Sequence, residues 1–531
     1  MCENARWAVG TPPFRDARSA PGFGPSTRTT SIVPLQFAIE NDRMDGMGQT
    51  AVSEDTLAER TFRREDQQWF AAFSGDHNPL HLDPTVARRS LFGQPVVHGV
   101  HAVLWSIDAL MARRPCRIGR VKVTFRKPLF LEESLDVVVD GVDTESVRLH
   151  LRRDEATLAV VELGLLGTVT GPSVPEANLS SMLKKAEVAA PHDRTSTNLR
   201  GAQGELDLEA FGVVAPDGAF PAATAALGAP TIAALAALSR LVGMECPGLH
   251  SLFAGFDVDV GAPSEGNALS WQVQRVDDRV GAVRMTVSGG SLEGRVDAFI
   301  RPLPAAQPTA NDLASKVDES EFFGMRALVV GGSRGLGELT AKLVASGGGE
   351  PVVTWHRGEA DAASVVADIE SAGGRASALH LDIEDPAPAV RELAALEVEP
   401  THVFYFASPR IFARRTLLFD RGLFLGFVDA YVVGFARVLA ALRRGGATDL
   451  RVYYPSTVAV EEGRKDLTEY ISAKSAGEAA ARTLSQTEPW LRVCIERLPR
   501  LPTDQTATLL QVPTDDPADH MLGAIRNTAR L

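Results

Sequence analysis

The run FAAFSGDHNPLHLDP, residues 70–84, gathers titratable and turn-forming residues at a density that a protein core rarely needs. Asp76, Asn78, Pro79 and His81 form the pattern D-x-N-P-x-H. Because proline fixes its own φ and disfavours helix at the residue before it, we expect a rigid, extended turn. An Asp/His pair held in this way can supply the general acid and base that add water across a C=C bond beside a thioester carbonyl, or remove it.

The same chemistry needs a hydrogen-bond donor for the thioester oxygen. In VVHGVHA, the N–H of Gly99 stands where a helix is expected to begin, and such a group can stabilise an oxyanion. The alternative is that NPLH is only a helix-capping turn and that His77, His81, His98 and His101 are ordinary polar residues. That reading suits an isolated histidine, but the whole run favours chemistry, with His81 in use and His77 as a bystander.

A second group of reactive residues lies near the C-terminus. Tyr470 and Lys474 form Y-x-x-x-K, and the four-residue spacing places both side chains on one face of a helix. An ammonium beside a phenol lowers the phenol's pKa, so Tyr470 can give a proton to a carbonyl oxygen as hydride arrives. The strand LRVYYPST ends in Ser456 and Thr457, either of which can be the accompanying catalytic hydroxyl.

A glycine-rich turn opens the same C-terminal part, in ALVVGGSRGLGELTAKLVASG. Between a strand and a helix, such a turn lets backbone N–H groups approach a pyrophosphate. NAD-dependent enzymes commonly place an acidic residue after the next strand, but TWHRGE has Arg357 there, and Arg334 lies inside the turn. Two cations suit a 2′-phosphate, so we expect NADP(H); the alternative is that each arginine simply faces solvent.

Length, composition and charge constrain the number of domains and the kinds of partner. The chain has 531 residues, 45% of them hydrophobic, with a net charge of −13. Roughly 100–200 residues per domain suggests three domains, and the acidic balance argues against nucleic acid as a partner. Four scattered cysteines predict neither a disulfide framework nor a metal site. Because we find no apolar run of about 20 residues and no hydrophobic signal core, we expect a cytoplasmic protein without a membrane span.

Polar stretches rich in Pro, Gly and Ser divide the chain. We expect a disordered tail at 1–35, a first α+β domain at 36–172, a linker at 173–199, a second α+β domain at 200–303, a linker at 304–321 and an α/β domain at 322–531.

Each α+β domain has one apolar helix followed by antiparallel strands, so two sheets, each wrapped around a helix, should join into one. In the first, GVHAVLWSIDALMARR places Val100, Val103, Leu104, Ile107, Leu110 and Met111 on one helical face. The last domain alternates short apolar strands with helices, which is typical of a parallel sheet covered on both faces.

The run from residue 70 to about 135 resembles the MaoC-like, R-specific enoyl-CoA hydratase family of hot-dog folds. The resemblance rests on SGDxNPxHxDPxxA, on FGxPVVHG and on VTFRKPLFLEESL, although Glu132 and Glu133 stand where the family usually has Gly-Asp. It implies that Asp76 and His81 are the catalytic dyad and that Gly99 offers the oxyanion N–H. The region at 200–303 lacks D-x-N-P-x-H, so we expect a degenerate second hot dog that only completes the fold.

Residues from about 325 to 506 resemble the short-chain dehydrogenase/reductase family, through the glycine turn, the hydroxyl pair and Y-x-x-x-K. The resemblance implies a Rossmann-type doubly wound sheet, with Tyr470 and Lys474 both catalytic and cofactor-binding. The other cofactor-binding residues that it implies are Gly331, Ser333, Arg334, Gly335, Leu336, Gly337, Arg357, Asp382, Ile383, Phe406 and Ala407. Two positions depart from the family: Tyr431 replaces its active-site asparagine and Arg500 a glycine, so the proton relay through water is expected to differ.

Together the two resemblances imply a ketoreductase and a dehydratase that act on 3-ketoacyl and 3-hydroxyacyl thioesters, in fatty-acid or polyketide-type biosynthesis. The carrier would be coenzyme A or an acyl carrier protein, and the resemblance predicts a homodimer. Two alternatives stay open: hydration followed by oxidation, as in fatty-acid breakdown, and a non-catalytic scaffold that binds acyl chains or a carrier.

Overall fold

The computed structural model describes residues 56–168, 189–208, 220–262, 267–385, 391–393, 396, 399–411, 419–506 and 514–531. The expected disordered tail at 1–35 lies outside these ranges, as does most of the expected linker at 173–199.

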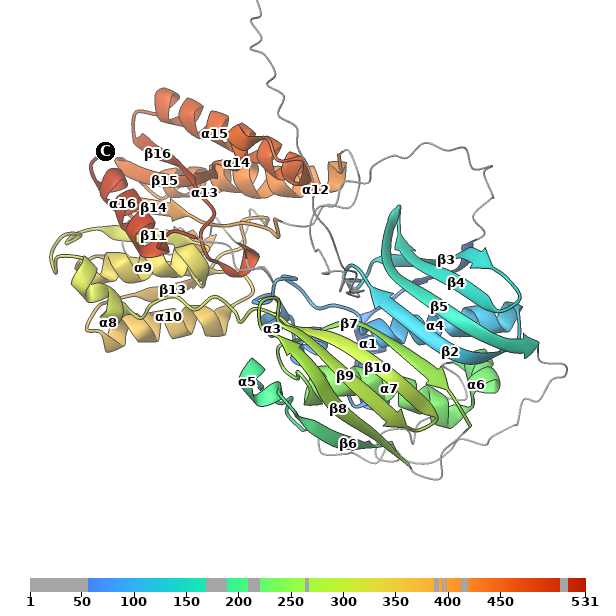
Figure 1. Ribbon diagram of the computed structural model, residues 1–531. Helices are drawn as coiled ribbons and strands as arrows, with labels where there is room; N and C mark the ends of the chain where they lie inside the picture. Colours follow the sequence, from blue (N-terminus) through green and yellow to red (C-terminus); the bar gives the residue numbers. More distant parts are fainter. Residues whose placement is uncertain are drawn as a thin grey trace, which may run out of the picture. The chain divides into compact units, whose positions relative to one another are not determined.

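The first half of the described chain builds one antiparallel sheet of ten strands (Figure 1). In spatial order the strands are β1 (Thr56–Thr61), β3 (Ser134–Val142), β4 (Ser146–Arg153), β5 (Ala156–Thr168), β2 (Cys116–Phe125), β7 (Ser251–Val260), β10 (Leu292–Ile300), β9 (Ala282–Gly289), β8 (Ala268–Asp277) and β6 (Gln203–Asp207). Five strands come from each of the two expected α+β regions. The sequence pattern predicted eight of the ten and missed the short outer strands β1 and β6.

The two regions meet where β2 pairs with β7, with Lys122 opposite Asp257 in the register. Arg120 strengthens the seam, because its guanidinium donates to both carboxylate oxygens of Asp257 at 2.8 Å. A single hydrophobic core runs beneath both halves of the sheet. The expectation of one continuous sheet is therefore confirmed.

Two long helices fill that core. The helix α4 (Gly99–Arg113) buries all six apolar side chains that its sequence pattern assigned to one face. Its counterpart α7 (Ala229–Arg240) continues into a π-helical turn, η1 (Leu241–Glu245). The remaining helices of this half are α1 (Arg64–Ser74), α2 (Pro79–Leu82), α3 (Pro84–Ala87), α5 (Ser196–Leu199) and α6 (Pro221–Leu227).

The C-terminal part is built on a six-stranded parallel sheet, as expected from its alternating pattern. Its strands in spatial order are β13 (Ser377–His380), β12 (Glu350–Trp355), β11 (Arg326–Val330), β14 (His402–Tyr405), β15 (Leu450–Thr457) and β16 (Leu491–Leu498). The order 3-2-1-4-5-6 is that of the dinucleotide-binding doubly wound fold, which binds its ligand at the carboxyl ends of the strands, where the order reverses. Here the reversal lies between β11 and β14.

Helices cover both faces of the parallel sheet, and a separate core lies on each face (Figure 1). One face carries α9 (Gly335–Ser346), α10 (Glu359–Ser371) and α16 (Pro517–Ala529), and the other carries α13 (Phe435–Arg444) and α15 (Thr468–Thr487). The other elements are α8 (Ala310–Leu313), η2 (Ala314–Lys316), α12 (Arg421–Val428), η3 (Asp429–Gly434), α14 (Ala459–Glu462), η4 (Lys465–Leu467) and η5 (Asp504–Thr506).

Among the described residues, one helical segment is long and apolar enough to cross a membrane by length and composition. It joins α12, η3 and α13 over Arg421–Arg444, 24 residues that include an 18-residue window with a mean hydropathy of 1.8. The expectation of no apolar run of about 20 residues did not single out this segment, which Asp429 and Arg437 interrupt. Phe427, Tyr431 and Phe435 of this segment are buried inside the protein. Core helices pass the same test, so the segment is weak evidence for a membrane span.

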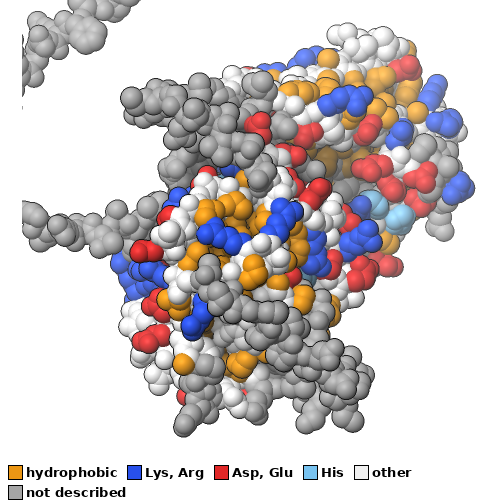
Figure 2. Space-filling view, turned by 90° about the vertical axis from the view of Figure 1, so that its right-hand side faces the viewer, with side chains coloured by type: hydrophobic (Ala, Val, Ile, Leu, Met, Phe, Trp, Pro, Cys, Tyr) orange, Lys and Arg blue, Asp and Glu red, His pale blue; other side chains and the backbone are white. Residues whose placement is uncertain are grey.

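On the face drawn in Figure 2, basic and acidic side chains are interspersed among apolar ones.

Candidate functional sites in the hydratase-like and reductase-like regions

The D-x-N-P-x-H run is not the extended turn that the sequence predicted. Asn78 is the N-cap of the one-turn helix α2, and its side-chain oxygen accepts from the N–H of Leu80 at 3.0 Å. Pro79 fits the first helical position because its fixed φ suits the helix and its missing N–H is not needed there. His81 therefore sits on a short, capped helix, and the capping interpretation of NPLH is structurally right without excluding a catalytic role.

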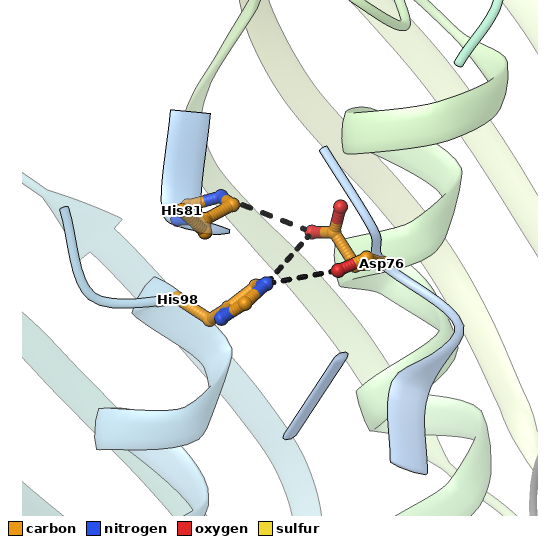
Figure 3. A group of neighbouring side chains, drawn as sticks. All are labelled: Asp76, His81 and His98. Carbon is orange, nitrogen blue, oxygen red and sulfur yellow. Dashed lines mark hydrogen bonds and ion pairs between the residues drawn. The ribbon is translucent and has the colours of Figure 1, made fainter. Parts of the chain in front are cut away.

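Asp76 and His81 face each other across this turn (Figure 3). The Nε2 atom of His81 lies 4.0 Å from Oδ2 of Asp76. The other ring nitrogen, Nδ1, lies 2.8 Å from the carbonyl oxygen of Val96, so it carries the proton and donates it there. The Nε2 lone pair is then left free on the side of Asp76.

A third side chain, His98, completes this cluster and was not singled out from the sequence. Its Nε2 lies 3.0 Å from the carbonyl oxygen of Asp76 and 3.9 Å from the Oδ2 atom of that carboxylate (Figure 3). Its ring stacks on that of His81, with 3.8 Å between the centroids. Gln67 fixes the ring from the other side, because its Oε1 atom lies 2.9 Å from both Nδ1 and the backbone N of His98.

The second α+β region also contributes directly to the cluster. From the last turn of α7, Ser239 donates to Oδ2 of Asp76 at 2.6 Å. Gly243, in η1, leaves room for the same carboxylate, since a Cβ at this position would overlap it. The carbonyl of Gly243 also accepts from the Asn78 side chain at 2.7 Å. The expectation that this region only completes the fold therefore misses its contacts with the dyad residue.

Burial dominates the electrostatics of the cluster. It raises the pKa of Asp76, against lowering by the charge of His81 and by the hydrogen bond from Ser239. It lowers the pKa of His81, which is therefore neutral and basic at Nε2. The carboxyl thus tends to keep its proton, and the neighbouring imidazole tends to lack one. This combination suits general acid–base catalysis.

Gly99 stands where the oxyanion interpretation needs it, as the first residue of α4 and directly after His98. Its N–H belongs to the first helical turn, which has no acceptor within the helix. A Cβ at this position would lie 2.6 Å from the ring of Phe125, so only glycine fits there without a shift of that ring.

Asp76, His81 and His98 also lie close enough together to ligate one metal ion. Both ring nitrogens of His98 already contact carbonyl oxygens, so a metal would have to break one of these contacts. The general acid–base arrangement accounts for the same three side chains without that cost.

The contact from Ser239 leads to a test of its role. In Ser239→Ala we expect the pKa of Asp76 to rise further, because a hydrogen bond to the charged carboxylate is lost. The limb of the hydration pH–rate profile that reports Asp76 should therefore move to higher pH, while the other limb stays. Ser270→Ala, which removes a serine hydroxyl that contacts Glu205 instead, is the matched control. An unmoved profile in Ser239→Ala would contradict the role.

The reductase-like residues meet at the carboxyl end of β15. Tyr470, on the first turn of α15, is 8% exposed. Its phenol is hydrogen-bonded to the Thr457 side chain, an interaction that opposes the burial that raises its pKa to about 12. Lys474 lies one turn further along the same helix, and its Nζ donates to the carbonyl of Pro455 at 2.8 Å.

The structure separates the two candidate hydroxyls. Ser456 points away from the tyrosine and donates to Glu478 at 2.6 Å. That carboxylate also accepts from Arg497 at 2.7 and 2.8 Å, so Ser456 is part of a structural network. Thr457, which contacts Tyr470, is the hydroxyl placed for chemistry.

The expected effect of Lys474 on the tyrosine is not found. Lys474 is not a cause of the pKa shift of Tyr470, which is upward. The Nζ atom of Lys474 lies instead over the ring of Tyr431, 3.9 Å from its centroid. Burial lowers the pKa of Lys474 to about 7, while the charge of Glu478 raises it.

The glycine turn between β11 and α9 has the close backbone approach that a pyrophosphate cradle requires. Gly331 has φ +80°, and a Cβ there would lie 3.0 Å from the backbone of Phe406 and Ala407. A Cβ on Gly337 would overlap the carbonyl of Gly331. Gly335, with φ +60°, begins α9, so its N–H and its neighbours' face the ends of the strands.

The remaining expected cofactor residues surround this turn. Ser333 is buried, Arg334 is the N-cap of α9, and Leu336 packs against the core. Asp382 and Ile383 follow β13, and the carboxylate of Asp382 lies 3.4 Å from Nε2 of His356.

The two expected phosphate-binding arginines differ. Arg334 is partly neutralised, because its guanidinium lies 3.4 Å from the carboxylate of Asp504. Arg357 is exposed and lies two residues after the carboxyl end of β12. Of the two, Arg357 is the better placed to receive a 2′-phosphate.

Comparisons with known proteins agree with the two family resemblances of the sequence. Residues 48–162 match the model of the MaoC like domain, and residues 325–402 match that of the short chain dehydrogenase. The first region is 31% identical over 109 residues to the (R)-specific enoyl-CoA hydratase of Aeromonas caviae, covering 20% of this chain and 78% of that protein. It is 34% identical over 110 residues to the Peroxisomal multifunctional enzyme type 2 of Drosophila melanogaster, covering 20% of this chain but only 16% of that protein's length.

Among solved structures, an alcohol dehydrogenase from Thermococcus sibiricus in complex with 5-hydroxy-NADP aligns with 39% of this chain and 91% of its own, at 19% identity and a TM-score of 0.35. The matches of the two family models do not overlap in the sequence. The chain thus belongs to the MaoC-like family of hydratases through its first region, and it carries a short-chain dehydrogenase domain in its C-terminal part.

Proposed function

We propose that the protein is a bifunctional enzyme that reduces 3-ketoacyl thioesters and dehydrates the resulting 3-hydroxyacyl thioesters. The observation that carries the proposal is the pairing of two sites in one chain that act on the same substrate carbon. The Asp76/His81 dyad suits removal of water between C2 and C3, and the Tyr470/Thr457 pair suits protonation of an oxygen on C3. The 3-hydroxyacyl thioester is the product of one site and the substrate of the other.

In the dehydratase step, neutral His81 takes the proton from C2 at its Nε2 atom. Asp76, whose pKa burial raises, gives a proton to the leaving hydroxyl, which departs as water. The N–H of Gly99 stabilises negative charge on the thioester oxygen while the C2 proton is removed. In the hydration direction the same groups exchange roles.

In the reductase step, Tyr470 gives its phenolic proton to the carbonyl oxygen at C3, and Thr457 orients that phenol. NADP(H), when bound, supplies the hydride that reaches C3. The turn from Gly331 to Gly337 would hold its pyrophosphate and Arg357 its 2′-phosphate, a fit supported by the close backbone approach at Gly331 and by the exposure of Arg357.

The finer assignments belong to the same proposal. The second α+β region is taken as a second hot dog, with the domain boundaries as predicted from the sequence, and the enzyme as a cytoplasmic homodimer. Preference for NADPH favours the reductive direction of fatty-acid or polyketide-type biosynthesis. The acyl group would be carried by coenzyme A or by an acyl carrier protein.

The test supplies the full-length protein with a 3-ketoacyl thioester and either NADPH or NADH, on coenzyme A or on an acyl carrier protein. We expect the absorbance of NADPH to fall, faster than that of NADH, and mass spectrometry to detect the 3-hydroxyacyl and then the 2-enoyl product. No cofactor consumption with any chain length on either carrier would overturn the reductase half. No exchange between hydroxyacyl and enoyl forms would overturn the dehydratase half.

A second candidate is hydration followed by oxidation. It is favoured by the similarity of the first region to proteins named for enoyl-CoA hydration and as a peroxisomal multifunctional enzyme. It predicts that a 2-enoyl thioester is hydrated and then oxidised with NAD, and that carrier-bound substrates do not react. The same assay, run from the enoyl side, distinguishes the two directions.

A further inference from the structure

Tyr431 occupies the place of the asparagine that the reductase resemblance leads one to expect, and it is fully buried at the site. We propose that Tyr431 is a positioning residue of the reductase site, whose ring face holds the Lys474 ammonium and keeps it charged. The inference deepens the proposed ketoreductase function and rests on it.

Two aromatic rings present their faces to the Lys474 ammonium. The Nζ atom of Lys474 lies 3.9 Å from the centroid of the Tyr431 ring and 5.4 Å from that of Tyr454. The face of an aromatic ring attracts a cation, and the attraction is strongest where water is excluded. One further N–H of the ammonium is satisfied by the carbonyl of Pro455. The rings therefore offset part of the cost of burying the charge, which would otherwise favour the neutral amine.

Buried tyrosine side chains hydrogen-bond to the backbone carbonyls around Tyr431. Residues Asp429–Gly434 form the π-helical turn η3, which interrupts the regular ladder, so its carbonyls need other donors. The hydroxyl of Tyr454 donates to the carbonyl of Tyr431 at 3.0 Å. Likewise, the hydroxyl of Tyr405 donates to the carbonyl of Ala430 at 2.7 Å. These two hydrogen bonds fix the π-helical turn, and with it the Tyr431 ring, relative to β14 and β15.

The charge of Lys474 matters because Tyr470 becomes a phenolate when it gives its proton to the substrate oxygen. The Lys474 ammonium, one helical turn further along α15, can return a proton to that phenolate, whereas a neutral amine cannot. The titratable groups that act on or contact the ammonium are Glu478 on its own helix, Tyr431 on η3 and Tyr454 on β15. Burial lowers the pKa of Lys474 to about 7, so the contribution of the rings decides how far the charge persists at neutral pH.

The experiment follows the titration of Lys474 by NMR in the full-length protein without cofactor, with ¹³C at the Cε atoms of its lysines. The chain has only eight lysines, and the spectrum of Lys474→Arg identifies the signal of interest. We expect Tyr431→Phe to leave the Lys474 midpoint unchanged, because the ring is kept. In Tyr431→Leu we expect the midpoint to fall by about 1 unit, because a desolvated cation–π contact is lost.

Phe427→Leu is the matched control, since Phe427 is buried and stacked on Tyr431 with 5.8 Å between the centroids. It removes the same aromatic volume from the same cluster, and we expect no shift of the Lys474 midpoint. Equal shifts in both leucine variants, or no shift in either, would overturn the proposal. A shift in Tyr431→Phe would also overturn it, by pointing to the hydroxyl that contacts Ser408 at 2.7 Å. Because no turnover is measured, this experiment can contradict the role of the Tyr431 ring without bearing on the ketoreductase function.

Discussion

We expect Asp76→Asn to lower hydration of a 2-enoyl thioester by about 10²–10⁴-fold while NADPH-dependent reduction of a 3-ketoacyl thioester stays unchanged. Asparagine has nearly the same shape, so it can still occupy the space beside Gly243 and keep a contact with Ser239. It has no proton that can be transferred to a leaving hydroxyl and no carboxylate that can take one back. The two rates are measured separately, from the absorbance of the enoyl thioester and from that of NADPH.

His77→Ala is the matched control for this prediction. His77 is the next residue in the run and is partly exposed, and no step of the proposed reaction uses it. We expect the hydration rate of this variant to stay within a few-fold of that of the parent protein. An equal loss in both variants would indicate that any disturbance of the turn is harmful and would remove the argument for Asp76 as the proton-transferring group.

Much of this site could be predicted from local sequence. The D-x-N-P-x-H run concentrates its functional residues within six positions, and the capped helix α2 places two of them against each other. The apolar pattern of residues 99–113 also predicted α4, because a helix buried on a sheet must repeat its apolar residues at helical spacing. Both patterns involve residues close together in the sequence, so they can be recognised without knowledge of the fold.

The contribution of the second α+β region could not be found in this way. Ser239 lies 163 residues from Asp76 in the sequence and is an ordinary serine in an alanine- and leucine-rich helix. Only the pairing of β2 with β7 brings its helix to the dyad. His98 was missed for a different reason: its histidine-glycine pair is visible in the sequence, but its ring contacts depend on Gln67 and His81.

In the reductase-like part, the sequence predicted the strands, the glycine turn and the tyrosine–lysine spacing, because each is fixed by local backbone geometry. It also identified Tyr431 as a departure. The position of the Lys474 ammonium over that ring could not be predicted, since it depends on the π-helical turn η3 and on the strand that carries Tyr454. The expected lowering of the Tyr470 pKa by Lys474 was wrong, because burial raises this pKa and the only opposing cause is the hydrogen bond to Thr457.

Tyr470→Phe should have the complementary effect on the two activities. We expect reduction of the 3-ketoacyl thioester to fall by about 10²–10⁴-fold, because the variant has no phenolic proton to give to the carbonyl oxygen. Hydration of the enoyl thioester should be unchanged. The ring of Phe fits the same buried space, between Phe427 and Tyr431, so the fold should be kept. Binding of NADPH, followed by its fluorescence, should also persist.

The matched control is Tyr453→Phe, which removes the hydroxyl of a buried tyrosine on β15. That hydroxyl contacts Glu496 at 3.3 Å and packs in the core on the other face, away from Tyr470. We expect this variant to retain reduction. If Tyr470→Phe lost both activities, the loss would reflect unfolding; if it lost neither, another group would be the proton donor. Independent loss of reduction in Tyr470→Phe and of hydration in Asp76→Asn is incompatible with a non-catalytic scaffold, because a scaffold has no rate for either substitution to lower.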